Sequence, residues 1–260
     1  MGDVLQPLSS RDLAWLHGIR LIATDMDGTL TQQERFTPAL LATLNDLERV
    51  GIRVLIVTGR SAGWVSGLSA YLPVAGAIAE NGGLYCFSNT VDVPQPLTDI
   101  ADISQHRKAL ASTFERVKSR FPHIQTAADN QFRVTDWTFE NQAFSASELD
   151  EMRLLCERDG WGFTYSAVQC HVKPAEQNKA RGVMQAIAAY FSGIAPTELL
   201  TVGDSPNDES LFELKRFPYS IGVANLLHYQ TELSHLPTRI TSAREGAGFC
   251  ELAEWLLRSR

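Results

Sequence analysis

Two aspartates near the amino terminus have the type and spacing needed for acid–base or metal chemistry. Asp25 and Asp27 stand two positions apart, after the apolar residues 21–24 and before Gly28. Side chains two positions apart in a strand share a face, so we expect both carboxylates to lie close together where a buried strand ends. Buried carboxylates repel each other and lose hydration, so they need a cation, a shared proton or a polar partner. An Asp-Gly surface turn is the ordinary alternative.

Further polar residues occupy similar places later in the chain, each following a strand-like apolar run or opening a helical pattern. They are Thr58, Lys179, Asp204, Asn207 and Asp208. In open α/β sheets, ligands bind at the carboxyl ends of the strands, so we expect these segments to converge on one crevice. Each residue also has an ordinary interpretation: Thr58 as a helix cap, Lys179 as a solvated lysine and Asp204 as a turn residue.

The residue types in the predicted crevice suit a phosphate ester and Mg²⁺. The carboxylates of Asp25 and Asp204, with a backbone carbonyl and waters, form the hard oxygen shell that Mg²⁺ prefers. Thr58 supplies a hydroxyl donor and Lys179 a positive charge, and both suit phosphate oxygens. The sequence therefore predicts one nucleophile, one acid or base, one metal ion and two phosphate donors.

The elements that must position these residues alternate between strand and helix. The strand-like runs are residues 21–24, 52–57, 75–79, 199–202 and 219–223. Helical patterns separate them, and the one that begins at Thr37-Pro38 and stops at Gly51 is an example. This alternation predicts an α/β fold with a Rossmann-like parallel-sheet core and right-handed crossovers.

The alternation is interrupted in the middle of the chain. Residues 83–173 show a helix, a hairpin, a second helix and a second hairpin, a pattern typical of an α+β unit. We expect the first hairpin to turn at residues 129–130 and the second helix to start at Ser147, with a capping box. The predicted organisation is a catalytic core of residues 1–82 and 174–260 with an inserted α+β domain over residues 83–173.

Composition and charge limit the partners. The chain has 260 residues, of which 44% are hydrophobic, and a formal net charge of -7. Nucleic acids and anionic membranes favour a basic surface, so we expect neither as a partner. The first residues, with Asp3 and no long apolar run, predict neither a signal peptide nor a membrane anchor. Four widely separated cysteines predict reduced thiols in a cytoplasmic protein. For the oligomeric state we expect a monomer or a small homo-oligomer.

The polar segments together resemble the four motifs of haloacid dehalogenase-like (HAD) phosphatases. DMDGT at residues 25–29 resembles the first motif, VTGR at 57–60 the second, Lys179 the third and GDSPND at 203–208 the fourth. The insertion resembles the type II cap domain of the subgroup that contains Cof-like and sucrose-phosphate phosphatases. The residue after Lys179 is not the glycine common in the family, which makes Lys173 a second candidate for the third motif.

This resemblance implies a two-step hydrolysis of a small-molecule phosphate ester. Asp25 attacks phosphorus to form an aspartyl phosphate, while Asp27 protonates the leaving alcohol and then activates water. The implied ligands of Mg²⁺ are Asp25, Asp27, Asp204 and Asp208. The implied phosphate-binding residues are Thr58, Lys179 and Asn207.

Candidates for selecting the leaving group lie in the insertion and in one core loop. Arg133 and Trp137 are expected on one face of a strand in the insertion, and His171 and Lys173 on one face of another. Arg60 follows the second motif threonine. If these faces look into the crevice, they could read a polyol or a sugar. We therefore expect a sugar phosphate, such as sucrose phosphate or a related glycosyl phosphate, ahead of a flavin or pyridoxal phosphate.

Two other classes of protein use a similar pocket. A phosphoacceptor signalling module shares the acidic pocket, Mg²⁺, threonine and lysine, but it is much shorter and has no need of an insertion. A non-catalytic phosphate-binding protein would retain the crevice, and the presence of Asp25, Asp27, Lys179 and Asp204 argues against it. Within the family, a phosphomutase also fits the motifs, although a type II cap disfavours it.

Overall fold

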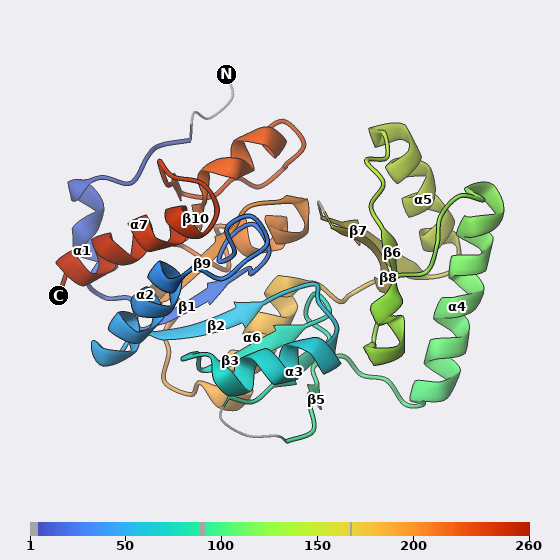
Figure 1. Ribbon diagram of the computed structural model, residues 1–260, viewed down its shortest axis with the longest axis horizontal. Coiled ribbons are helices and arrows are strands. Elements are labelled where there is room, and N and C mark those ends of the chain that lie inside the picture. The colour runs from blue at the N-terminus through green and yellow to red at the C-terminus, as the bar shows by residue number, and fades with distance from the viewer. Residues whose placement is uncertain (1–4, 89–91, 167) are drawn as a thin grey trace.

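A largely parallel β-sheet forms the centre of the larger part of the molecule, and one of its central strands leads directly into Asp25. The structure is a computed structural model that describes residues 5–88, 92–166 and 168–260. Figure 1 shows a core built on this sheet and a smaller domain, hereafter the cap, beside the carboxyl ends of the core strands.

The core sheet has eight strands in the part of the chain that the structure describes, in the order β11-β10-β9-β1-β2-β3-β4-β5. Their bounds are β1 Leu21–Thr24, β2 Arg53–Val57, β3 Gly76–Ala79, β4 Leu84–Cys86, β5 Gln95–Pro96, β9 Leu199–Gly203, β10 Ser220–Gly222 and β11 Arg239–Ile240. Neighbours from β11 to β3 are parallel, whereas β4 and β5 add antiparallel pairs. The predicted α/β fold with a Rossmann-like parallel core is confirmed.

Helices cover both faces of this sheet because successive residues of its buried strands point to opposite sides. Ile22 of β1 packs into the apolar cluster under α2, α3 and α7, whereas Leu21 and Ala23 pack into the cluster under α6. The α-helices of the core are α1 Leu13–Leu16, α2 Pro38–Arg49, α3 Ala62–Tyr71, α6 Lys179–Tyr190 and α7 Glu245–Arg258. Its 3-10 helices are η1 Ser10–Asp12, η3 Pro196–Glu198, η4 Pro206–Phe212 and η5 Ala224–Tyr229.

The ends of α2 agree with their sequence signals. The Thr37 hydroxyl accepts a hydrogen bond from the Leu40 amide at 3.1 Å, and Pro38 occupies the first turn. Such a cap satisfies an amide left free at the helix start and contributes about 1 kcal/mol. Gly51 follows the helix with φ of 79°, a left-handed conformation that glycine adopts without a steric penalty.

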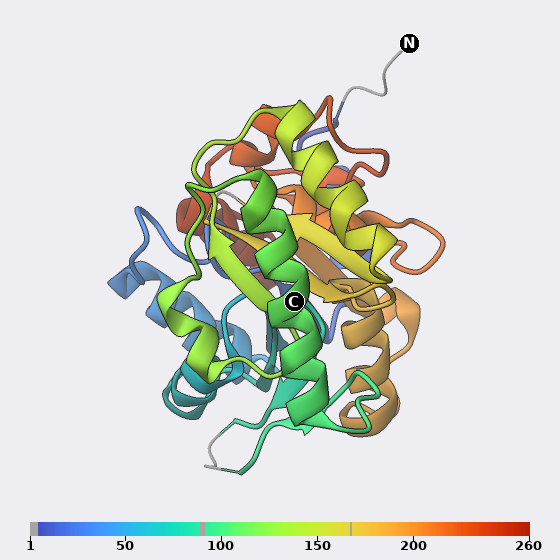
Figure 2. The same ribbon diagram turned by 90° about the vertical axis from the view of Figure 1, so that its right-hand side faces the viewer.

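The cap is a three-stranded antiparallel sheet with two helices on the side away from the core (Figure 2). Its strands are β6 Trp137–Glu140, β7 Trp161–Tyr165 and β8 Gln169–Pro174, and its helices are α4 Ile103–Arg120 and α5 Ala146–Arg158. An apolar cluster of its own, which includes Phe114, Phe139 and Met152, joins sheet and helices. The opposite face of the sheet is therefore free to look toward the core.

The first predicted hairpin of the cap is wrong in its turn and in the extent of its strands. Residues Ala128–Phe132 form the 3-10 helix η2, and the strand that follows starts only at Trp137. The cause is Asn130, which is buried and donates to the carbonyls of Ala127 and Thr138 at 3.1 and 2.6 Å. Thr126 and Phe139 still pair as an isolated antiparallel bridge, and the Ala127 amide donates to the carbonyl of Thr138 at 3.0 Å, so the side-chain bonds of Asn130 change the turn and shorten the pairing.

The predicted start of α5 at Ser147 is also wrong, because the helix begins at Ala146 after the cap residue Ser145. The helix is capped by Ser145, whose hydroxyl accepts from the Glu148 amide at 3.4 Å, while Glu148 accepts from the Ser145 amide at 2.8 Å. The same sequence signal, a serine followed three residues later by an acid, occurs at Ser147 and Asp150. The glutamate completes the capping box more readily because its longer side chain reaches back to the cap.

The core sheet continues past residue 83, where the sequence predicted the insertion to begin. Both β4 and β5 pair within the core sheet, and Leu97 packs into a core apolar cluster. Residues 1–4, 89–91 and 167, on which predictions about the amino terminus, a connector and the second hairpin turn partly depend, lie outside the described residues. Within the described part of the chain, no helix combines the length and apolar character required to cross a membrane.

Several contacts among the described residues attach the cap to the core, and on the β3 side they include a hydrogen bond from the Gln177 amide to the Thr135 hydroxyl at 3.1 Å. The buried Glu80 carboxylate, after β3, accepts hydrogen bonds from the backbone amides of Val134 and Thr135 and from the Thr135 hydroxyl. Arg133 donates to the carbonyl of Gly59 at 2.9 Å. The Tyr165 hydroxyl donates to the Glu232 carboxylate at 3.0 Å, at an exposed position on the other flank of β1.

We expect Gly82→Ala to destabilise the protein by about 2–4 kcal/mol. Gly82 has φ of 101°, and a Cβ there would lie 2.2 Å from the carbonyl oxygen of Asn178, the residue that caps α6. The matched control is Gly67→Ala in α3, where a Cβ meets no atom within 4 Å. Alanine is the better helix former, so this control should gain about 0.5–1 kcal/mol. Urea unfolding compares the two, and equal stabilities would contradict the assignment of strain to Gly82.

Candidate active site

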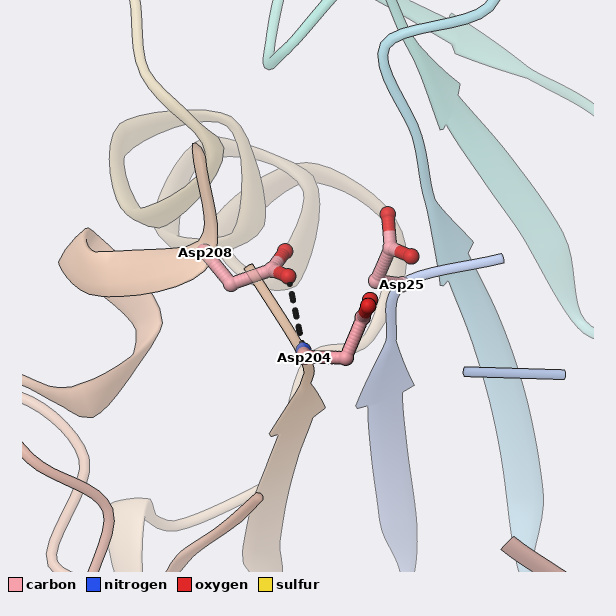
Figure 3. Close-up of side chains that lie close together, drawn as sticks. All are labelled: Asp25, Asp204 and Asp208. Atoms are coloured by element: carbon pink, nitrogen blue, oxygen red, sulfur yellow. Dashed lines mark hydrogen bonds between the residues drawn. The ribbon is translucent and has the colours of Figure 1, made fainter. Parts of the chain in front are cut away.

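Three buried carboxylates meet where β1 and β9 end. Asp25 follows β1, Asp204 follows β9, and Asp208 lies in η4. The strands are neighbours, and the Asp25 amide donates to the carbonyl of Val202 at 2.9 Å, so their ends lie side by side. One oxygen from each of the three carboxylates lies within 4.8 Å of the others. Figure 3 shows the three side chains gathered at this edge of the sheet.

Lys179 is the cation that faces this cluster. It is the first residue of α6, a helix capped by Asn178, and its side chain is fully buried. Its Nζ lies 2.5 Å from Oδ1 of Asp25 and 2.6 Å from Oδ1 of Asp208. Burial alone would lower the pKa of Lys179, but Asp208 and Asp25 together raise it, so the ammonium stays charged.

The loops around Asp204 hold its carboxylate from two sides. The Thr29 hydroxyl donates to Oδ1 of Asp204 at 2.9 Å, and the Asn225 amide donates to Oδ2 at 2.7 Å. Asn225 also donates to the carbonyl of Gly28 at 3.0 Å. Gly28 has φ of 82°, and a Cβ at this position would lie 2.6 Å from Oδ2 of Asp204. Only glycine lets the first motif turn this close to the fourth.

The cluster carries more negative charge than Lys179 offsets. Burial raises the pKa of Asp25 to about 7, with Lys179 opposing the shift and Asp208 and Asp27 adding to it. Burial, with Asp25 and Asp208 nearby, also raises the pKa of Asp204 well above its ordinary value. Three buried carboxylates facing one ammonium are a site for a further cation. Their oxygen donors fit a hard divalent ion such as Mg²⁺.

Asp27 is held apart from this cluster by Arg60. The guanidinium donates through Nε to Oδ2 of Asp27 at 3.0 Å and through a terminal nitrogen to Oδ1 at 2.7 Å. Arg60 also lies over the ring of Trp64, 5.3 Å from its centroid. Both members of the pair are partly exposed and line the same cavity as Asp25.

A cavity of about 460 Å³ lies between these core loops and the cap. Asp25, Asp27 and Asp204 line it from the core, whereas Gln169 and His171 of β8 line it from the cap. Its volume is within the range of roughly 300–1,000 Å³ that is typical of small-molecule sites. The carboxylate cluster therefore opens onto a space that accommodates a small metabolite.

Comparison with known proteins agrees with this arrangement. Residues 22–110 match the family model of haloacid dehalogenase-like hydrolases. A phosphoglycolate phosphatase of Sulfolobus acidocaldarius is 31% identical over 199 residues, which are 75% of this chain and 80% of that protein. The chain belongs to the haloacid dehalogenase-like hydrolase family. The predicted resemblance to haloacid dehalogenase-like phosphatases is confirmed.

Solved structures share the fold over nearly the whole chain. The structure of Thermoplasma acidophilum 0175 gives a TM-score of 0.72 at 21% identity and covers 92% of this chain and 98% of that one. The sucrose-phosphatase of Synechocystis, solved with sucrose and phosphate, gives a TM-score of 0.66 at 16% identity, with coverages of 90% and 97%. At these identities the likeness extends to the fold alone.

The remaining core residues predicted for this hydrolase lie around the cluster in different ways. Thr58 is fully buried at the end of β2, where its hydroxyl accepts from the Arg60 amide at 3.1 Å, and it does not line the cavity. Asn207 does line the cavity, and its amide donates to Oδ1 of Asn81 at 3.3 Å. Both oxygens of Asp208 are engaged, one by Lys179 and the other by the amides of Asp204 and Ser205.

Of the residues predicted to select the leaving group, Arg60 and His171 line the cavity. Arg133 is buried between Asp136 and Asp129, and it lines a separate hollow of the cap together with Trp137. The prediction that Arg133 and Trp137 share one face of a strand is wrong, because Arg133 precedes β6. Lys173 is buried beside the carbonyl of Gln177, to which it donates, and lies outside the cavity.

Sequence reasoning missed several residues of the site. Thr29 lies within the first motif, which is a signal that was available. Asn225 has no motif of its own, and only the fold brings it to Asp204. Asn81, at φ of 54°, is buried next to Asn207, and its Nδ2 has no hydrogen-bond partner among the described residues. A buried amide left unpaired at this place is a donor available to an oxygen of a ligand.

Proposed function

We propose that this enzyme is a Mg²⁺-dependent phosphomonoesterase that hydrolyses a small phosphorylated metabolite through an aspartyl-phosphate intermediate. The observation that carries the proposal is the set of three buried carboxylates around Lys179 at the end of a metabolite-sized cavity. Family membership and the names of the relatives support a phosphatase. A phosphoacceptor module would have no need of the cap that covers this cavity.

Asp25 is the nucleophile in this proposal. Lys179 holds its Oδ1, whereas Oδ2 has no hydrogen-bond partner among the described residues, and the side chain lines the cavity. Attack of Oδ2 on phosphorus forms the O–P bond as the bond to the leaving alcohol breaks. Positioning of this kind accounts for much of phosphoryl-transfer catalysis.

Asp27 is the proton donor and acceptor in this proposal. It gives its proton to the leaving oxygen and then takes one from the water that attacks the aspartyl phosphate. In the structure both oxygens of Asp27 are bonded to Arg60, so at least one of these bonds has to open during a cycle. Arg60 is thus proposed as the residue that holds Asp27 between its two proton transfers.

The residues proposed to hold Mg²⁺ are Asp25, Asp204 and the backbone carbonyl of Asp27, with Asp208 in a supporting position. When bound, the ion offsets the charge of the carboxylates and of the phosphoryl oxygens. Asn207, which lines the cavity, and the unpaired amide of the neighbouring Asn81 are proposed to donate to phosphoryl oxygens, and Thr58 is proposed to shape the loop behind them. Lys179 is proposed to contribute its positive charge next to Oδ1 of Asp25.

For the leaving group, we propose a sugar or polyol. The cavity is larger than a two-carbon acid requires, and the cap contributes polar side chains to it. A second candidate is phosphoglycolate, because several relatives carry the name phosphoglycolate phosphatase. Flavin and pyridoxal phosphates, which place an aromatic ring in the site, rank behind both.

The test is phosphate release from a panel of phosphorylated metabolites with Mg²⁺ and with a chelator. We expect release from at least one ester, and a loss of at least about 100-fold on chelation that Mg²⁺ reverses. Mg²⁺ should also raise the melting temperature, because it offsets the repulsion among the buried carboxylates. Absence of release from every ester, or release that is indifferent to chelation, would refute the proposal.

We expect Asn225→Ala to raise the Mg²⁺ concentration for half-maximal activity by roughly 10–100-fold. Asn225 orients Asp204 through one amide that also bonds the carbonyl of Gly28. The matched control is Asn45→Ala, an exposed residue of α2 whose amide bonds only a carbonyl of its own helix. Titration of activity with Mg²⁺ measures both variants. Equal half-activation concentrations would contradict a role of Asn225 in holding the metal ligand.

A further inference from the structure

A buried set of charged residues holds the imidazole of His171 over the cavity. Its Nδ1 lies 2.8 Å from Oδ2 of Asp136, and both side chains are almost completely buried. Arg133 donates to both oxygens of Asp136 at 3.0 and 3.1 Å. Arg133 is bonded in turn to the carbonyl of Gly59 in the core. The imidazole is therefore fixed relative to the core loop that carries Arg60.

These contacts define which ring nitrogen carries the proton. Burial alone would raise the pKa of Asp136, but Arg133 and His171 together lower it, so the carboxylate is charged and accepts from Nδ1. Burial lowers the pKa of His171 in spite of Asp136, so the ring is neutral. A neutral imidazole that donates through Nδ1 has an acceptor lone pair on Nε2.

The Nε2 atom of His171 is placed where a leaving group would lie. His171 lines the cavity, and a Cβ added to Gly59 would lie 3.1 Å from Nε2, so glycine leaves the approach to this nitrogen open. Among the described residues, Nε2 has no hydrogen-bond partner. It is not one of the fully buried unpaired atoms of the described residues, so a ligand hydroxyl or a water in the cavity can supply its donor.

The charges that line the cavity favour a neutral hydroxyl as the group that donates to Nε2 of His171. Besides three aspartates, Glu34 and Glu245 line it, and Arg60 is the single arginine or lysine among the described residues that do so. Arg60 is already paired with Asp27 through two bonds. A carboxylate on the leaving group would meet no unpaired arginine or lysine, and it has no proton to give to Nε2. A hydroxyl needs no positive partner, and it has a proton to donate to Nε2.

We propose that His171 is a specificity-determining residue whose Nε2 accepts a hydrogen bond from a hydroxyl of the leaving group and disfavours leaving groups with a carboxylate in its place. The proposal rests on the proposed phosphatase function and defines its substrate class as phosphate esters of neutral polyols or sugars. It separates this chain from a phosphatase for phosphoglycolate, whose leaving group is an acid.

The test uses pairs of esters that differ only by CH₂OH in place of a carboxylate. The pairs are 2-hydroxyethyl phosphate with 2-phosphoglycolate, glycerol 3-phosphate with 3-phosphoglycerate, and glucitol 6-phosphate with 6-phosphogluconate. Three lengths are needed because the reach from phosphorus to Nε2 decides which hydroxyl is read. Ethyl phosphate, with neither group, reports hydrolysis as such. At the length that reaches Nε2, we expect kcat/KM for the hydroxyl member to be about 10–100-fold higher.

Variants then assign the preference to His171. His171→Leu should bring the ratio within that pair toward one, mainly through loss of the hydroxyl member, whereas His171→Gln, whose amide oxygen still accepts, should retain part of it. The control is His235→Leu, an exposed histidine outside the cavity, which should keep the wild-type ratio. Should His171→Leu fail to fold, ¹⁵N NMR of wild-type His171 gives the same answer: glucitol is expected to shift the Nε2 signal and gluconate is not.

The outcomes separate the inference from the function on which it rests. Release from none of the esters, ethyl phosphate included, overturns the proposed function and the inference together. Release without preference for the hydroxyl member in any pair, or with preference for the carboxylate, overturns the inference alone. A wild-type ratio retained by folded His171→Leu overturns the role of His171.

Discussion

Asp25→Asn is expected to lower kcat by roughly 10⁴-fold or more, because an amide oxygen is a far weaker nucleophile than a carboxylate. Asn has the size of Asp and can still accept from Lys179, so the site should keep its shape. The measurement is phosphate release from the best ester of the panel. Rapid quenching with acid should trap an acid-stable mass increase of one phosphoryl group on a peptide of the wild type, and none on the variant.

The matched control is Asp46→Asn, in α2, where the carboxylate is partly exposed and pairs with Arg49 on the same helix. This variant removes one negative charge from the core without touching the cavity, and we expect wild-type kcat. If Asp25→Asn retained a kcat within tenfold of the control, Asp25 would not be the nucleophile. Direct attack of water on the ester would then replace the two-step reaction.

Lys179→Met is expected to have the largest effect on stability, a loss of about 3–5 kcal/mol. Methionine fills a similar volume, but it leaves the buried carboxylates of Asp25 and Asp208 without the ammonium that lies 2.5 and 2.6 Å from them. Burial of an unpaired charge costs more than loss of the pair itself, so the effect should exceed that of an exposed lysine. Activity should fall as well, because Oδ1 of Asp25 is no longer held.

Urea unfolding of Lys179→Met beside Lys108→Met measures this difference. Lys108 is exposed in α4 of the cap, and its replacement should change stability by less than about 0.5 kcal/mol. Mg²⁺ should restore part of the lost stability in Lys179→Met, because a bound cation offsets the charge that the lysine had offset. Unfolding of both variants at the same urea concentration would contradict the view of Lys179 as the counter-charge of the cluster.

The core site was predictable because each of its motif residues follows a local pattern. Asp25 and Asp204 come directly after apolar runs, and parallel neighbouring strands bring such positions to one edge without further information. Lys173 ranked behind Lys179 because it stands at the end of a predicted strand of the insertion, and the structure places Lys179 beside Asp25. The positions of these residues at the ends of neighbouring parallel strands therefore account for most of the arrangement of the site.

The cap was less predictable because the side chain of Asn130 determines the turn where a hairpin was expected. Asn130 bonds the carbonyls of Ala127 and Thr138, and the strand that follows starts only at Trp137. Arg133 therefore lies before the strand and cannot share a face of it with Trp137. Alternation along β8 predicts that His171 and Lys173 share one face of the strand. Only the fold shows that His171 lines the cavity whereas Lys173 does not. Asn225 depends on a contact between η5 and the first motif, which no local pattern contains.

The unequal attachments of the cap predict the direction in which it moves. On the side of β3, Glu80 of the core accepts from Thr135 of the cap, and Arg133 of the cap donates to the carbonyl of Gly59. Separation there would leave several groups unpaired at about 1–3 kcal/mol each. On the side of β10, the Tyr165–Glu232 bond is exposed, and water can replace it at little cost. The easy motion we expect is therefore a hinge rotation about an axis near Glu80, which would open the cavity past Tyr165 while Arg133 and Asp136 keep the imidazole of His171 near Gly59.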